Sequence, residues 1–270
     1  MKKLGLIVLV AGIVLMAGCA GDDPAGPSGT LPAVTGLAIG TSSAGRNVDL
    51  SWNAVDDVDG YKIYFRASST GAWTDSVDVT SGTSGQHANA TSAGYYTVKA
   101  YEGNNYSENN SNIVNTLPTD VSTTYTIYDN YSAVGQPSGF IFGTTAGQTG
   151  SASSGSFEQD IYAFDEDAPI LGDLTVRLYT GDKAPFGTGK TTYMAEPDNT
   201  GYCDLYPTGT WHSAYSLNAG DVRVFLYLEN GHYVKMYNIV VTEDTETANG
   251  TKVSFSYEIQ TGGLTLFTSN

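Results

Sequence analysis

Apolar and polar positions alternate in short runs along most of the chain, and turn residues separate the runs. A period of two is typical of strands that bury one face. The clearest runs are Val48, Leu50 and Trp52; Tyr61, Ile63 and Phe65; Tyr96, Val98 and Ala100; Leu174, Val176 and Leu178; and Val253, Phe255, Tyr257 and Ile259. No segment carries an apolar stripe at helical spacing. The pattern therefore predicts an all-β fold.

The runs fall into two predicted domains. Residues 31–117 have the size of one small β-sandwich, and the segment LPTD at 117–120 marks the boundary. Residues 118–270 continue with strand patterns throughout. We therefore expect an N-terminal β-sandwich followed by a larger antiparallel β domain.

The strongest turn signal is Asn230-Gly231, which lies between two strand patterns and predicts a β-hairpin. Pairing Glu229 with His232 across it assigns every second residue to the core face. That face would hold Val222, Val224, Leu226, Leu228, Tyr233, Tyr237, Ile239 and Val241. Lys235 falls on the same face, so it must either extend its amine to solvent or find a partner. The opposite face would hold Arg223, Phe225, Tyr227, Glu229, His232, Val234 and Met236.

The first residues have the layout of a targeting signal. Two lysines at positions 2–3 precede an apolar run over residues 4–16, which ends in Ala17-Gly18-Cys19. This resembles a bacterial lipoprotein signal, which implies removal of residues 1–18 and acylation of Cys19. Residues 19–30 lack large apolar side chains after the cysteine and form a flexible tether. Residue 20 is not aspartate, so the common inner-membrane retention signal is absent and we expect a lipid anchor in the outer membrane. Whether the protein faces the periplasm or the cell surface stays open.

Charge and motif content narrow the function classes. The chain has 270 residues with 12 Lys and Arg against 28 Asp and Glu, a net charge of −16. This acidic excess argues against nucleic acid as a partner, because binding phosphates needs clustered basic residues. Cys203 has no accompanying catalytic signature, and no Gly-X-Ser-X-Gly elbow occurs. We therefore expect a protein that is not an enzyme and has no catalytic residues.

The N-terminal segment resembles a fibronectin type III domain. The matching stretches are residues 32–37 (PAVTGL), 48–52 (VDLSW), 60–64 (GYKIY) and 95–101 (YYTVKAY). Trp52 corresponds to the core tryptophan of that family and Tyr96 to its late buried tyrosine. Such modules serve as spacers, adhesion surfaces or polysaccharide-associated linkers, so the resemblance implies the fold and leaves the function open.

The C-terminal segment resembles the HmuY family of bacterial haem-binding lipoproteins. The matching stretches are residues 139–142 (GFIF), 157–164 (FEQDIYAF), 211–215 (WHSAY), 223–235 and 252–257 (KVSFSY). The resemblance implies haem capture at the cell surface, with the iron held between two His or Met side chains. From it we expect Met194 and His212 as ligands, and Tyr193 and Trp211 beside the porphyrin. His232 and Met236 are further candidates, and we expect no metal other than haem iron.

Two other functions stay open. The protein is alternatively an adhesion or polysaccharide-binding accessory lipoprotein, in which Trp73, Trp211 and the many tyrosines stack on sugar rings. It is otherwise a structural envelope protein with no small-molecule ligand. In each case the membrane is a partner through the lipid anchor. A partner receptor in the outer membrane and the oligomeric state are not defined by the sequence.

Overall fold

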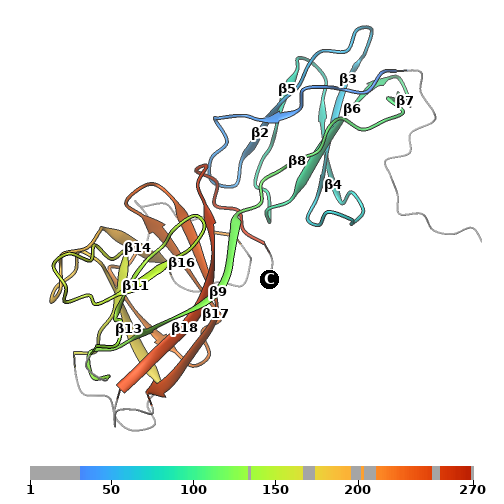
Figure 1. Ribbon diagram of the computed structural model, residues 1–270. Helices are drawn as coiled ribbons and strands as arrows, with labels where there is room; N and C mark the ends of the chain where they lie inside the picture. The colour runs from blue at the N-terminus through green and yellow to red at the C-terminus, as the bar shows by residue number, and fades with distance from the viewer. Residues whose placement is uncertain are drawn as a thin grey trace, which may run out of the picture.

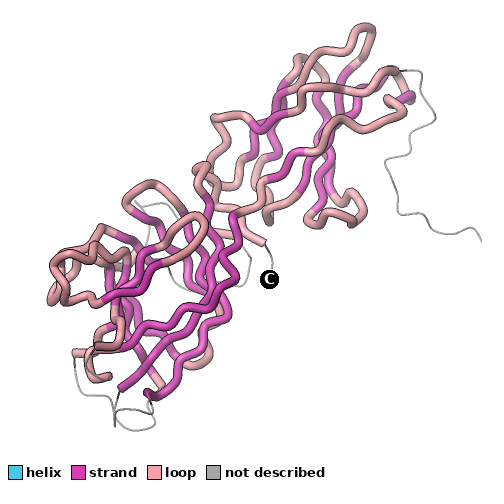
Figure 2. The backbone as a smooth tube through the Cα atoms, viewed as in Figure 1, coloured by secondary structure: helices cyan, strands magenta, loops and turns pink. Residues whose placement is uncertain are grey.

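The computed structural model describes residues 31–132, 135–166, 174–195, 202–203, 211–244 and 250–268. All regular secondary structure in these ranges is β, which confirms the predicted all-β fold (Figure 1, Figure 2). Within the same ranges, no helix is long and apolar enough to cross a membrane. The predicted signal at 1–18, Cys19 and the tether lie outside the described residues.

The N-terminal domain is a sandwich of two antiparallel sheets. The first sheet has the order β1-β2-β5, with bounds Ala38–Ile39, Val48–Ser51 and Ser84–His87. The second has the order β4-β3-β6-β7, and β8 pairs with β6; the bounds are Asp75–Val79, Gly60–Arg66, Tyr95–Glu102, Asn105–Tyr106 and Val114–Asn115. The sheets pack face to face.

The core of this sandwich includes the residues that the alternation predicts. Val48, Leu50, Ile63, Tyr96, Val98 and Ala100 are buried between the sheets, together with Trp52, Tyr61 and Phe65. The Trp52 and Tyr61 rings lie 5.3 Å apart. Because successive side chains point to opposite faces, the residues between these positions lie on the outer faces.

The C-terminal domain also consists of two five-stranded antiparallel sheets. One has the order β11-β10-β12-β13-β15, with bounds Gln148–Gly150, Gly139–Ile141, Ile161–Ala163, Thr175–Thr180 and Ala214–Asn218. The other, which we call the β17 sheet, has the order β14-β16-β17-β18-β9. Its bounds are Thr192–Ala195, Arg223–Leu228, Tyr233–Asp244, Gly250–Gln260 and Thr119–Tyr128.

The inner faces of these two sheets enclose one hydrophobic core. Its centre is an aromatic cluster in which Phe140 contacts Phe142 and Phe255 at ring distances of 4.8 and 5.0 Å, and Tyr257 contacts Phe142 at 5.1 Å. These contacts are edge-to-face or nearly so, the arrangement that aromatic quadrupoles favour. The β17 sheet thus has an inner face in this core and an outer face turned away from it.

The β16–β17 hairpin has a different register from the predicted one. Leu228, not Glu229, pairs with His232, since its N–H donates to the His232 carbonyl at 2.9 Å. The loop therefore has three residues, and Gly231 takes the left-handed conformation with φ +83°, as three-residue hairpin loops require. A shift of one residue moves side chains to the other face. The prediction is therefore wrong for part of the hairpin.

The corrected faces are as follows. Val224, Leu226, Leu228, Val234, Met236 and Val241 lie in the core, and Arg223, Phe225, Tyr227, Tyr233, Lys235 and Tyr237 lie on the outer face. Val222, predicted in the core, is 53% exposed. A second irregularity follows at Asn238, which has φ +51° at a bulge between Tyr237 and Val240.

The C-terminal segment links the two domains. Three residues separate the end of β8 from the start of β9, yet the chain returns to the first domain after β18. Leu264 and Leu266 lie in the N-terminal core, 6% and 0% exposed. The Thr265 N–H donates to the Gly45 carbonyl at 2.8 Å, and the Ala93 N–H donates to the Phe267 carbonyl at 3.0 Å. The expectation of one domain over residues 118–270 did not anticipate this exchange.

Candidate functional site

The β14 strand places two of the predicted ligand-binding residues on opposite faces of the β17 sheet. Met194 pairs with Leu226 and lies in the core with an exposed fraction of 0%. Tyr193 precedes it, and the alternation of a strand turns its side chain to the outer face, where it is half-buried next to Tyr227. The thioether and the phenol therefore face different surroundings.

The second pair of predicted residues is divided in the same way. His212 and Met194 are cross-strand neighbours, with N–H to carbonyl distances of 2.8 and 2.9 Å in both directions. The backbones of Met194 and His212 therefore lie side by side. Trp211, one residue earlier, lies on the outer face with its ring 6.3 Å from that of Tyr227. One porphyrin therefore has no single face from which to contact all four residues.

The predicted haem site therefore does not fit the described residues. Met194 and Met236 are both 0% exposed and are packed among aliphatic and aromatic side chains of the core. Ligation of iron by either thioether would require the two sheets to separate. His232 lies half-buried beside the hairpin loop, at the end of the sheet. The physical reason is the period-two alternation, which separates sequence neighbours to opposite faces.

The outer face instead carries a continuous row of aromatic side chains, which we call the aromatic row: Tyr193, Tyr227, Tyr233 and Trp211. The three tyrosines are direct neighbours across β14, β16 and β17. Ring centroids of Tyr227 lie 6.3 Å from Tyr193, 4.8 Å from Tyr233 and 6.3 Å from Trp211. Tyr193, Tyr227 and Trp211 are half-buried, whereas Tyr233 is 4% exposed.

Two members of this row were not predicted. The assumed hairpin register placed Tyr233 in the core, and Tyr227 was assigned to the opposite face without a role. The signal that could have found them is Gly231: read as the left-handed residue of a three-residue loop, it pairs Tyr227 with Tyr233 on one face. Both tyrosines then align with Tyr193.

The next row on the same face contains a buried ion pair. Lys235 and Glu258 are cross-strand neighbours with exposed fractions of 0% and 1%, and the ammonium lies 2.9 Å from the carboxylate. The Lys235 ammonium also donates to the Thr268 carbonyl at 2.7 Å, while the N–H and hydroxyl of Thr268 donate to Glu258. Burial lowers the pKa of Lys235, and the Glu258 charge opposes that effect. Of the two outcomes expected for Lys235, an amine extended to solvent or a partner, the structure shows the partner; the residue lies on the outer face and not on the predicted core face.

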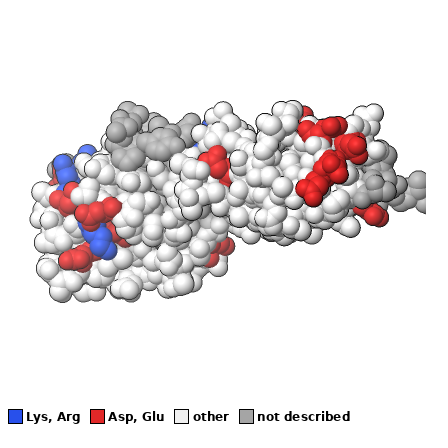
Figure 3. All heavy atoms as spheres, turned by 90° about the horizontal axis from the view of Figure 1, so that it is seen from above, with Lys and Arg blue, Asp and Glu red and all other residues white. Residues whose placement is uncertain are grey.

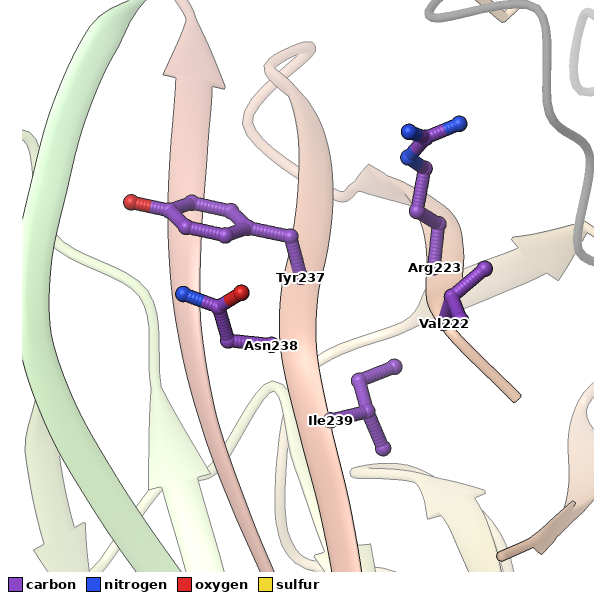
Figure 4. A pocket seen from close by; sticks show the side chains of 5 residues that line it. All are labelled: Val222, Arg223, Tyr237, Asn238 and Ile239. Carbon is purple, nitrogen blue, oxygen red and sulfur yellow. The ribbon is translucent and has the colours of Figure 1, made fainter. Parts of the chain in front are cut away.

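A pocket of about 340 Å³ lies near the bulge, lined by Val222, Arg223, Tyr237, Asn238 and Ile239 (Figure 4). Arg223 and Val222 extend from the start of β16, and Ile239 extends from β17 toward them. Tyr237 points the other way, across β18, and its hydroxyl donates to Asp120. Burial, together with this hydrogen bond and the Asp120 charge, raises the pKa of Tyr237. The pocket combines one cationic group with aliphatic surface.

Charges are distributed unevenly over the molecule. In Figure 3 the visible face of the N-terminal domain shows carboxylates without Lys or Arg beside them, whereas both signs mix at the far end of the C-terminal domain. Among the residues that the structure describes, no group of three or more His, Cys, Asp or Glu side chains could hold a metal ion. An acidic surface repels polyanions, so neutral ligands suit the N-terminal domain better.

Comparison with known proteins gives a likeness of fold over part of the chain. No protein-family model matches the chain, and no curated protein matches it. A solved Fn3-like protein from Clostridium thermocellum is 22% identical with a TM-score of 0.28, over 33% of this chain and 91% of that one. An FN3 domain of human collagen XX is 26% identical with a TM-score of 0.28, over 34% and 99%. Neither likeness extends to function.

Proposed function

We propose that the protein is a non-catalytic, glycan-binding lipoprotein of the bacterial envelope, and that it binds its ligand at the aromatic row. The observation that carries this proposal is the alignment of Tyr193, Tyr227 and Tyr233 on one outer face, with Trp211 against the middle ring. Two tyrosines and the tryptophan in that row keep part of their surface exposed.

The chemistry of a sugar ring suits this arrangement. A pyranose presents a face of C–H bonds that packs on an aromatic ring, while its hydroxyls extend sideways to polar groups. Tyrosine and tryptophan provide both a flat apolar surface and a hydrogen-bonding group at its edge. Because neighbouring strands lie about 4.8 Å apart, the partly exposed rings of Tyr193 on β14 and Tyr227 on β16, with Trp211 beside them, offer a repeated platform to a chain of sugars.

Attachment to the membrane is the second part of the proposal. It rests on the residues that precede Cys19 and on the tether that follows, which would hold the binding domains away from the bilayer. Several acyl chains on one cysteine give lasting attachment, since each buried CH₂ contributes about 0.8 kcal/mol. Cys19→Ala should abolish the incorporation of a labelled fatty acid into the protein; labelling that persists in this variant would contradict acylation at this residue.

Haem is the ligand that the HmuY resemblance implied, and no feature of the described residues favours it over a glycan. The four residues expected around the porphyrin lie on two faces of one sheet, and the Met194 thioether is enclosed. Haemin is therefore the competing ligand in the experiment and not a second proposal.

The test uses the soluble form that begins at Ala20, which keeps every described residue. Its retention on insoluble cellulose, chitin and peptidoglycan, and its binding to a glycan array, would be measured next to a haemin titration followed in the Soret region. We expect saturable glycan binding that Tyr227→Ala and Trp211→Ala reduce. Tyr128→Ala is the control, because Tyr128 lies on β9 at the opposite edge of the sheet. Absence of glycan binding, or a saturable haemin complex alone, would overturn the proposal.

A further inference from the structure

A second aromatic pocket lies on the N-terminal domain, away from the aromatic row. It has a volume of about 230 Å³ and is lined by Tyr64, Trp73, Thr74, Asp75 and Ser76. Tyr64 belongs to β3 and the last two residues to β4, while Trp73 and Thr74 end the loop between these strands. Ser76 pairs with Tyr64 across the two strands, so the serine side chain and the phenol ring share one face.

The two rings of this pocket are held in place by their neighbours. The Arg66 guanidinium lies 4.4 Å from the centre of the Trp73 ring, a cation–π distance. The same guanidinium donates to the Gly71 carbonyl at 3.2 Å, which fixes the loop before the tryptophan. The Tyr64 and Trp73 rings lie 6.4 Å apart and are tilted by 59°. The rings therefore form two angled walls before any ligand arrives.

Asp75 fixes the start of β4 from the other face of the strand, because it pairs with the buried Phe65 and not with Tyr64. The Asp75 carboxylate accepts the Ser76 N–H at 2.7 Å and is paired with the His87 imidazole at 2.9 Å. His87 is in turn held by the Tyr96 hydroxyl at 2.9 Å. These bonds anchor the strand whose next residue, Ser76, faces the pocket.

These features select one class of ligand. A cationic ligand would compete with Arg66 for the Trp73 ring. A neutral sugar does not meet this obstacle: its C–H face packs on a ring, and its hydroxyls extend to the polar groups at the rim. The exposed Thr74 and Ser76 add further hydroxyl groups at the rim.

We propose that this pocket is a second glycan site, which takes one pyranose unit of the same polysaccharide that the aromatic row binds. This inference rests on the proposed function. The two sites lie on domains that the C-terminal segment joins, since Leu264 and Leu266 are part of the N-terminal core. A polysaccharide can therefore contact both sites of one molecule, and two linked sites bind more tightly than either alone, by a factor on the order of 100 or more.

The test measures binding isotherms of the Ala20–Asn270 form on the glycan that it retains most strongly. Trp73→Ala should weaken binding by a factor on the order of 100 or more, as should Tyr227→Ala, and the double variant should lose binding. Ser76→Gln is a second variant, because it fills the pocket from an exposed position and leaves Trp73 and Arg66 in place. Ile113→Ala, at a position 47% exposed on the same domain, is the control.

Each result decides between the two sites. Unchanged binding in both Trp73→Ala and Ser76→Gln, with loss in Tyr227→Ala, would overturn the second site and leave the aromatic row. Loss in the pocket variants with no change in Tyr227→Ala would support the second site and overturn the aromatic row. A wild-type protein that binds no glycan would overturn both proposals. If Trp73→Ala lowers the melting temperature markedly, the Ser76→Gln isotherm alone decides the second site.

Discussion

The two faces of the β17 sheet differ in the side chains that the same strands present. The inner face is apolar and sealed by the opposite sheet, and it contains Met194 and Met236 at 0% exposure. The outer face carries aromatic rings and charges, among them Tyr193 and Lys235. Residues adjacent in sequence therefore differ completely in the chemistry available to them. A ligand site is defined by one face, and not by proximity along the chain.

The outer face is itself divided. At the row of Lys235 and Glu258 the C-terminal segment covers the sheet, with Phe267 at 0% exposure above the ammonium. At the aromatic row, two residues along each strand, Tyr193, Tyr227 and Trp211 keep part of their surface exposed. The covered row contributes to folding as a core does, whereas the aromatic row is the surface at which we propose binding. Three measurements break or sharpen this contrast.

The largest effect is expected at the covered row. Lys235→Met leaves the Glu258 carboxylate buried without its cation, and such a change costs about 3–5 kcal/mol of the free energy of unfolding. The double variant Lys235→Met/Glu258→Leu removes both charges and should recover most of this loss. Urea unfolding of the wild type, the single variant and the double variant measures both the loss of stability and its recovery. A single variant within about 1 kcal/mol of the wild type would show that the pair is accessible to water.

An intermediate effect separates the two faces at neighbouring residues. Met194→Ala should cost about 2–5 kcal/mol, because it leaves a cavity in the core. Tyr193→Ala removes a half-buried ring and its contact with Tyr227, which should cost about 1 kcal/mol. Glycan retention should follow the opposite order, reduced by Tyr193→Ala and unchanged by Met194→Ala at temperatures where both are folded. Equal effects of the two variants on binding would contradict the division of faces.

Much of the fold could be predicted from local pattern. The alternating runs at Val48 to Trp52 and at Val253 to Ile259 give buried positions as expected, because period two follows from strand geometry alone. The need of Lys235 for a partner also follows from its position among apolar residues. Its partner could not be named, since Glu258 is brought to it by the pairing of β17 with β18.

Two features of the candidate site lay beyond local pattern. The hairpin register depends on whether Asn230-Gly231 forms a two-residue or a three-residue loop, and a change of one residue exchanges the two faces. Leu264 and Leu266 return to the first domain because they contact residues more than 150 positions away in sequence. The periodicity of a local segment cannot predict such contacts. The division of Tyr193 from Met194 and of Trp211 from His212, by contrast, follows from alternation once a strand is assumed.

The smallest effect concerns a half-buried acid, Asp165, which, unlike the buried Glu258, faces another carboxylate. Burial, followed by the charge of Asp129, raises the pKa of Asp165 to about 6, against hydrogen bonding from the Arg177 N–H and the Arg177 charge. The native state then holds the Asp165 proton more tightly than the unfolded chain, in which the pKa of this carboxyl is near 3.8. The protonated carboxyl therefore contributes its full stability below about pH 4, and this contribution is lost as the pH rises to about 6. Asp165→Asn should therefore stabilise the protein at pH 7 and have little effect at pH 4, as measured by melting temperature. The control is Asp56→Asn at an exposed position, whose melting temperature should change with pH as that of the wild type does. If the melting temperature of Asp165→Asn also changes with pH as that of the wild type does, the Asp165 carboxyl is ionised throughout this range.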